Sequence, residues 1–216
     1  MVWKLFLKTW PQFLEGTGIT LLASAIAVGF GTVLGSLVCM MRLSKSKILR
    51  FISSAYIEVI RGTPILLQLW LFFLLPSQLG MDVPKFACAC FALVVNSTAY
   101  VADVILSGIQ SVDYGQTEAA RSLGMSHRQT MLKIVLPQAI RNILPALGNE
   151  FVTIIKETSL LSVFLVGDIM TIRATMGAAY FMPFQALIIA GVIYFVLTFV
   201  LSKGIGYIER RMARSD

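Results

Sequence analysis

Long apolar stretches alternate with short polar segments along the whole chain. An α-helix needs about 20 apolar residues to cross the hydrocarbon core of a membrane. The pattern therefore predicts about five membrane-spanning helices, at Gly18–Met41, Ala55–Leu75, Phe86–Ile109, Leu144–Val166 and Met182–Ile205. The fourth stretch also contains charged residues, so its assignment depends on length and context as well as on hydropathy. The first stretch is too long and starts too late for a typical cleaved signal peptide, and we expect it to be retained.

The composition supports this class of protein. Hydrophobic residues make up 57% of the chain and charged residues only 13%, whereas soluble domains have about 45–50% and about 25%. We therefore expect an all-α, polytopic membrane protein, and we expect residues 1–216 to form a single transmembrane domain because no linker-like segment divides them. Three cysteines lie inside apolar stretches, where they pack as small apolar residues, and no metal site is expected.

Basic residues in the segments between the stretches predict the orientation, because Lys and Arg collect on the cytoplasmic side. One side has twelve: Arg42, Lys45, Lys47, Arg50, Arg121, Arg128, Lys133, Arg141, Lys203, Arg210, Arg211 and Arg214. The other side has four: Lys4, Lys8, Lys85 and Arg173. We therefore expect the N-terminus outside and the C-terminus in the cytoplasm. The net charge of +7 is then explained by the topology and by attraction to anionic lipid. A nucleic-acid partner is not needed to explain it.

Polar side chains inside the stretches gather on single helix faces. The face on the third stretch covers roughly 60° and consists of Asn96, Tyr100, Asp103 and Ser107. The face on the fourth covers roughly 120° and consists of Asn149, Glu150, Thr153, Lys156 and Glu157. On the second stretch Glu58 and Arg61 are three residues apart and can meet on one face. Because charge in a bilayer usually faces protein or water, these residues indicate either a hydrophilic pathway or structural ion pairs between helices.

The segment between the third and fourth stretches has the start and stop signals of two short helices. Gly124 can end the first, Thr117–Leu123, in the left-handed conformation. Ser126 and Gln129 have the spacing of a capping box that opens the second, and Pro137 is expected to break that helical run. The segment therefore predicts a compact, rigid projection on the cytoplasmic side.

Three segments resemble one known family. The sequence Glu118-Ala119-Ala120, three residues, Gly124, and then nine residues to Ile134-Val135-Leu136-Pro137, resembles the EAA loop of bacterial ABC importer permeases. Arg61-Gly62-Thr63-Pro64 is similar to the RGTP segment of the polar amino acid permeases of the histidine/glutamine type, and Lys156-Glu157-Thr158-Ser159-Leu160 is similar to a further segment of that family. The resemblance extends over about residues 16–211.

The resemblance implies a permease subunit in the bacterial cytoplasmic (inner) membrane. Two permeases, identical or related, would pair around a translocation pathway, above a dimer of cytoplasmic ABC ATPases. An extracytoplasmic binding protein would deliver the amino acid. The loop around 117–137 would couple to the ATPase, through Glu118, Ala119, Ala120, Gly124 and Pro137. The chain has no G-x-x-x-x-G-K loop, so ATP is expected on a partner and no cofactor on this chain.

Two positions depart from the family pattern. Leu106 stands where the family usually has a basic residue, and Glu150 stands where a neutral amide is expected. The second to fourth stretches then contain four acids, Glu58, Asp103, Glu150 and Glu157, against Arg61 and Lys156. This excess mildly favours a cationic amino acid as substrate. The amino acid itself, and the choice between a homodimer and a heterodimer, stay open.

Two other functions were weighed. An enzyme in the membrane would need a nucleophile with a base, or metal ligands, and the single histidine, His127, lies in the loop. We therefore expect no enzyme activity. A standalone channel or secondary transporter would need no docking loop for an ATPase, and the five stretches show no obvious inverted repeat. Copurification distinguishes these alternatives, because a permease would bring an ATPase with it.

Overall fold

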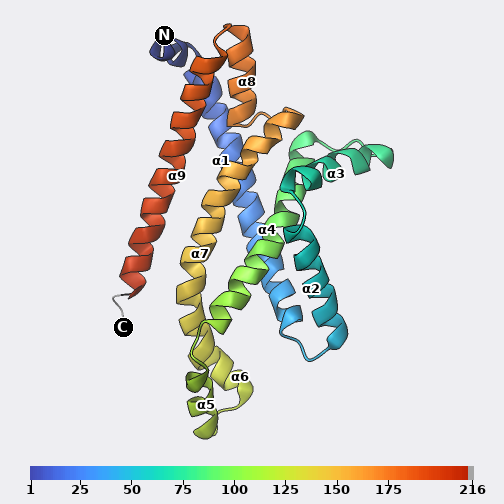
Figure 1. Ribbon diagram of the computed structural model, residues 1–216, viewed down its shortest axis with the longest axis vertical. Helices are drawn as coiled ribbons and strands as arrows, with labels where there is room; N and C mark the ends of the chain where they lie inside the picture. The colour runs from blue at the N-terminus through green and yellow to red at the C-terminus, as the bar shows by residue number, and fades with distance from the viewer. Residues whose placement is uncertain (214–216) are drawn as a thin grey trace.

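The computed structural model describes residues 1–213, and within that range all regular structure is helical (Figure 1). The helices are α1 (Val2–Arg42), α2 (Lys47–Arg61), α3 (Ile65–Gln78), α4 (Lys85–Gln110), α5 (Tyr114–Ser122), α6 (His127–Thr130), α7 (Leu136–Glu157), α8 (Ile169–Ala179) and α9 (Pro183–Ala213). Helices α1, α4 and α9 are each long and apolar enough to cross a membrane, and the count rises to five if each of two bent helix pairs is one span. The predicted all-α polytopic class is therefore confirmed.

Helix α1 is longer than the predicted first span, which was expected to begin at Gly18. It begins at Val2 and continues through Pro11 to Arg42 without interruption. The apolar pattern identifies only the part that matches the hydrocarbon core, and Lys4, Lys8 and Glu15 interrupt that pattern while the helix continues. Helix α9 likewise continues past the predicted end at Ile205.

Two glycines allow α1 to pack closely against α4. A Cβ atom on Gly31 would lie 2.9 Å from the Cβ of Ser97, and one on Gly35 would lie 2.9 Å from Cγ1 of Val101. Both distances are too short for a real side chain. In lipid, such small residues let helices gain packing and hydrogen-bonding contacts that larger residues prevent. Gly31 and Gly35 therefore set the crossing of these two helices.

The predicted second span, Ala55–Leu75, is wrong as one continuous helix. Helices α2 and α3 meet at an angle of 103°. Pro64 lacks an N–H group and disfavours the helical conformation at Thr63, so the chain leaves the helix at Gly62 and starts again at Ile65.

Two backbone carbonyls at this break accept hydrogen bonds from one buried side chain, Gln68. Its Nε2 donates to the carbonyl oxygens of Ile60, at 2.8 Å, and Thr63, at 3.2 Å. Its Oε1 accepts from Nδ2 of Asn96 on α4, at 3.0 Å. Unpaired backbone groups are costly in a membrane, so this network stabilises the bend and fixes it to α4.

The predicted break at Pro137 is also wrong. Helix α6 continues through a π-helical segment, Met131–Val135, directly into α7. Pro137 lies in the first turn of α7, where the wider turns of the preceding π-helix accommodate the missing N–H group. The helix that contains the predicted fourth span therefore starts before Leu144.

Beyond α7 the helical path tightens and then bends. A 3-10 helix, Thr158–Phe164, follows α7, and the chain turns by 47° into α8. Leu165 and Gly167 have positive φ at this turn, and buried Asp168 caps α8 by accepting from the backbone N–H of Met170 at 2.9 Å. The turn between α8 and α9 then forms one end of the molecule along its longest axis, and α5 and α6 form the other (Figure 1).

Phe181 occupies a strained position in the turn between α8 and α9. Its φ is 53°, a left-handed conformation that costs a residue with a Cβ roughly 1–2 kcal/mol. The N–H of Phe181 donates to Ala178 and that of Met182 to Gly177, which is the Schellman pattern of a helix end. Glycine usually occupies this place.

Candidate functional site

Asp103 is the centre of a charged cluster that joins three helices. Its Oδ2 lies 2.5 Å from Nη1 of Arg61 at the end of α2, and its Oδ1 lies 3.8 Å from Nη1 of Arg42 at the end of α1. The Arg61 guanidinium also lies 5.3 Å from the centre of the Tyr100 ring, within the range of a cation–π interaction. Asp103, Tyr100 and Arg61 are thus brought together, with the negative charge of Asp103 compensated.

The predicted contact between Glu58 and Arg61 is wrong. Arg61 turns away from its own helix toward α4, and Glu58 is exposed without an ion pair to any residue in 1–213. Spacing along one helix cannot reveal a partner 42 residues away. The acidic excess expected in the membrane therefore comes from residues other than Asp103.

The polar face of α4 divides into a buried part and an open part. Asn96 is only 3% exposed and belongs to the Gln68 network at the bend. Asp103 and Ser107 instead line a cavity of about 310 Å³ between α4 and α7. Across this cavity lie Asn142 and Ala146 of α7.

The predicted polar face of α7 lies beyond this cavity. Asn149 and Lys156 are exposed, whereas the other members are half-buried: Glu150, Thr153 and Glu157. The Thr153 hydroxyl donates to the backbone carbonyl of Asn149, at 3.1 Å. Between residues 1–213 no ion pair involves Lys156 or either glutamate of this face. A charged face that the chain itself does not compensate needs water or a partner in the membrane.

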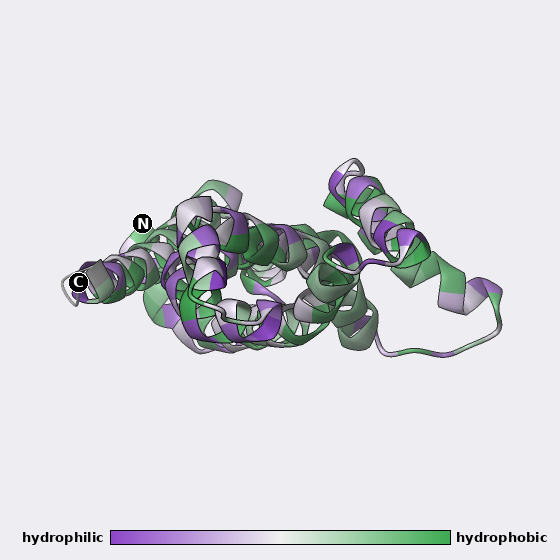
Figure 2. Ribbon diagram, turned by 90° about the horizontal axis from the view of Figure 1, so that it is seen from below, coloured by the Kyte–Doolittle hydropathy of each residue, from purple (hydrophilic) through white to green (hydrophobic). Residues whose placement is uncertain are grey.

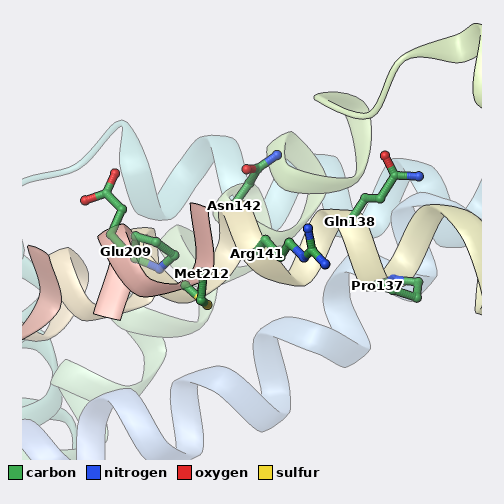
Figure 3. Close-up of a pocket in the computed structure, with 7 residues that line it drawn as sticks. Pro137, Gln138, Arg141, Asn142, Glu209 and Met212 are labelled. Atoms are coloured by element: carbon green, nitrogen blue, oxygen red, sulfur yellow. The ribbon is translucent and has the colours of Figure 1, made fainter. Parts of the chain in front are cut away.

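Asn142 was missed by the sequence reasoning. It lies seven residues before Asn149, which is two helical turns and hence the same face, so a longer window would have included it. Its Nδ2 donates to Oγ of Ser111 at 2.8 Å and ties α7 to the end of α4. Asn142 also lines a second cavity of about 700 Å³, where the start of α7 meets the end of α9 and Arg141 and Glu209 lie on opposite helices (Figure 3).

The loop between α4 and α7 forms the predicted rigid projection. Helix α5 begins earlier than the expected Thr117, because Asp113 caps it by accepting from the backbone N–H of Gly115 at 2.6 Å. Gly124 has φ 84°, as predicted. The predicted capping box is present, with Ser126 N–H donating to Oε1 of Gln129 at 2.8 Å. Viewed from this end, hydrophilic residues gather around the projection (Figure 2).

The residues expected to couple to a partner differ in exposure. Glu118, Ala119 and Pro137 are exposed, whereas Ala120 is buried and packs inside the projection. Sequence reasoning missed Leu123, the residue before Gly124, whose side chain is 84% exposed. Together with Glu118 and Ala119, Leu123 defines what we call the coupling surface.

Comparison with known proteins identifies relatives over nearly the whole chain. Residues 17–214 match the family model "Binding-protein-dependent transport system inner membrane component". The arginine transport system permease protein ArtQ of Bacillus subtilis (strain 168) is 39% identical, over 95% of this chain and 94% of the relative. The probable glutamine ABC transporter permease protein GlnM of the same organism is 37% identical, over 98% of each chain.

Solved structures have the same fold. The crystal structure of an amino acid ABC transporter with histidines has a TM-score of 0.93 and 44% identity, covering 95% of this chain and 96% of that one. An inward-facing methionine ABC transporter, MetNI, has a TM-score of 0.81 at 19% identity, with 95% and 98% covered. That second likeness concerns the fold alone. The chain therefore belongs to the family of inner membrane components of binding-protein-dependent transport systems, as an ABC importer permease.

Proposed function

We propose that this chain is the permease subunit of an ATP-driven importer for a polar amino acid. The N-terminus lies outside the cell, and the coupling surface faces the cytoplasm. The observation that carries this proposal is the rigid, capped loop with its exposed Glu118, Ala119 and Leu123, in a chain similar to amino acid permeases along its length. A transmission element has to be rigid and has to project from the membrane, and the loop meets both requirements.

The proposed partners supply ATP binding and face the charged side chains of α7. ATP is bound by a dimer of cytoplasmic ABC ATPases that contacts the coupling surface, so the permease itself carries no cofactor and no enzyme activity. A second permease, identical or homologous, faces the polar side chains of α7, because neither Lys156 nor Glu157 has an ion-pair partner among residues 1–213. An extracytoplasmic binding protein delivers the substrate.

Coupling is tested by a pair of matched glycine variants. Gly124 and Gly80 both have positive φ, at 84° and 70°, and a Cβ on either meets no atom within 4 Å. A β-branched residue strains both turns equally. We expect Gly124→Val to abolish stimulation of ATP hydrolysis by substrate in the reconstituted complex, whereas Gly80→Val leaves it normal. Equal coupling in both variants would refute the role of the loop.

The substrate is proposed to be polar and preferentially cationic. Relatives are named for the transport of arginine, glutamine and cystine. Since Asp103 is compensated by two arginines, the acidic character of the pathway rests on Glu150 and Glu157. We expect Glu157→Gln to reduce uptake of arginine about tenfold more than uptake of glutamine, because only the cationic substrate loses a charge partner, and a tenfold change corresponds to about 1.4 kcal/mol. Glu15→Gln, at an exposed position of α1, is the control, and equal losses for both amino acids would exclude a cationic preference.

A further inference from the structure

The two most exposed large apolar side chains in residues 1–213 lie at opposite ends of the molecule. Phe181 is 93% exposed and Leu123 is 84% exposed. Leu123 lies in the loop of α5 and α6, and Phe181 in the turn between α8 and α9 (Figure 1). Lipid accounts for apolar exposure along the spanning helices, but both of these residues lie in turns that connect helices. Leu123 belongs to the coupling surface, and Phe181 has no role in the function proposed above.

The backbone presents Phe181 on a rigid support. The N–H of Phe181 donates to the Ala178 carbonyl at 3.2 Å, and the N–H of Met182 donates to Gly177 at 2.9 Å. Gly177 is buried, and a Cβ there would lie 3.0 Å from Cα of Pro183. The turn is therefore closed by hydrogen bonds and close packing while the ring points away from the protein.

Phenylalanine is an unusual residue for the left-handed conformation at position 181. A left-handed residue at the C′ position of a helix is usually glycine, because glycine has no Cβ to clash. Non-glycine residues in such conformations occur preferentially at functional sites, where the side chain has a use. Neither packing nor burial uses this ring, so its use lies outside the chain.

A basic side chain lies at the same turn, against the ring of the neighbouring residue. The Nζ of Lys8 lies 5.9 Å from the centre of the ring of Tyr180, the neighbour of Phe181. An exposed aromatic ring on a turn that also holds a basic side chain fits an apolar depression bordered by acidic groups, since aromatic anchors and complementary charge give protein contacts their energy and their orientation.

We propose that Phe181, supported by Tyr180 and Lys8, is the anchor by which the permease docks its extracytoplasmic amino-acid-binding protein. This inference rests on the proposed importer function, which places the turn between α8 and α9 outside the cell. The occupant is a protein rather than lipid, because the ring stands on a hydrogen-bonded turn at the end of the molecule and the family to which the chain belongs depends on a binding protein.

The experiment uses the complete transporter in lipid nanodiscs. The probe is the purified extracytoplasmic amino-acid-binding protein of the same cell that, loaded with its amino acid, stimulates ATP hydrolysis by the wild-type complex. Phe181→Gly removes the ring and also relieves the left-handed strain, so it is expected to fold with unchanged or higher thermal stability. We expect its affinity for the binding protein to fall about tenfold or more. Phe181→Tyr keeps an aromatic ring and should retain most of the affinity.

Leu79→Ala is the matched control, since Leu79 is likewise an exposed apolar residue at a helix end, in the loop between α3 and α4. The affinity of this variant for the binding protein should match that of the wild type. Unchanged affinity in Phe181→Gly would overturn the proposal. So would strong quenching of Phe181→Trp fluorescence by brominated lipids, because the ring would then lie in the membrane. If no binding protein stimulates the wild-type complex, the importer function fails as well; if the wild type is stimulated and Phe181→Gly binds equally well, only the docking assignment fails.

Discussion

Arg61 and Asp103 form an ion pair, 2.5 Å between Nη1 and Oδ2, that closes the bend between α2 and α3 against α4. The two residues are 42 positions apart in the chain. Each of the two would be a costly charge in the membrane alone. Together with the Gln68 network, the pair fixes a helix break that would otherwise expose backbone groups.

We therefore expect replacement of Asp103 to lower the stability of the fold. Asp103→Asn leaves Arg61 and Arg42 without their acceptor, and we expect a loss of about 1 kcal/mol, because the pair is partly exposed. The measurement is the thermal unfolding of the purified permease in detergent. Glu58→Gln, one turn away on α2 and without an ion pair among the described residues, serves as the control. If both variants unfold at the same temperature, the ion pair does not stabilise the bend.

Gln68 should be more important for stability than its position in an apolar helix suggests. Gln68→Leu keeps the volume but removes the donor to Ile60 and Thr63 and the acceptor for Asn96. We expect a loss of about 1–3 kcal/mol for the unpaired groups. Because Asn96 shares the network, the double variant with Asn96→Leu should cost less than the sum of the single variants. Strictly additive losses in a double-mutant cycle would show that the residues act separately.

Leu123 should contribute to the attachment of the ATPase. Leu123→Ala shortens the exposed apolar side chain without disturbing Gly124, and we expect about tenfold weaker binding of the ATPase. Leu79→Ala provides the comparison, because Leu79 also ends a helix and also precedes a glycine with positive φ. The readout is copurification of the ATPase at increasing dilution. Equal retention by the two variants would place the contact elsewhere in the loop.

The orientation can be tested with single cysteines. In a background without Cys39, Cys88 and Cys90, Ser46→Cys should be protected from an impermeant thiol reagent in intact cells, whereas Ser77→Cys should react. Both positions are exposed, so accessibility to the reagent depends on the side of the membrane. The reverse labelling pattern would invert the topology and place the coupling surface outside the cell. The tail beyond residue 213, which was predicted to be cytoplasmic, lies outside the described residues.

The features that could be predicted from the sequence are local ones. Apolar length indicates where the spans lie. The turn at Gly124 and the capping box at Ser126 depend on neighbouring residues alone, and both are present. In the site, the shared face of Asp103 and Ser107 follows from helical periodicity, and the structure places both on one cavity.

The features that were mispredicted depend on contacts between distant segments. Arg61 pairs with Asp103 rather than with Glu58 because of how α2 packs on α4. The spacing of residues within α2 carries no information about that packing. The burial of Asn96 likewise depends on Gln68, 28 residues away. Pro137 was expected to end a helix because a regular α-helix cannot contain it without loss of a hydrogen bond, and only the π-helical turn before it removes that conflict.

The continuity of α6, the π-helical segment Met131–Val135 and α7 has a mechanical consequence. From His127 to Glu157 the chain is continuously helical, about 45 Å long at the rise of an α-helix. A rotation of the loop is therefore transmitted to Glu157 through one continuous helix. One residue corresponds to a rotation of about 100° around the helix axis. The π-helical segment therefore sets the angle, around that axis, between the coupling surface and the polar side chains of α7. Deleting one residue from it would turn those side chains toward a different neighbour while every contact at the loop stayed in place.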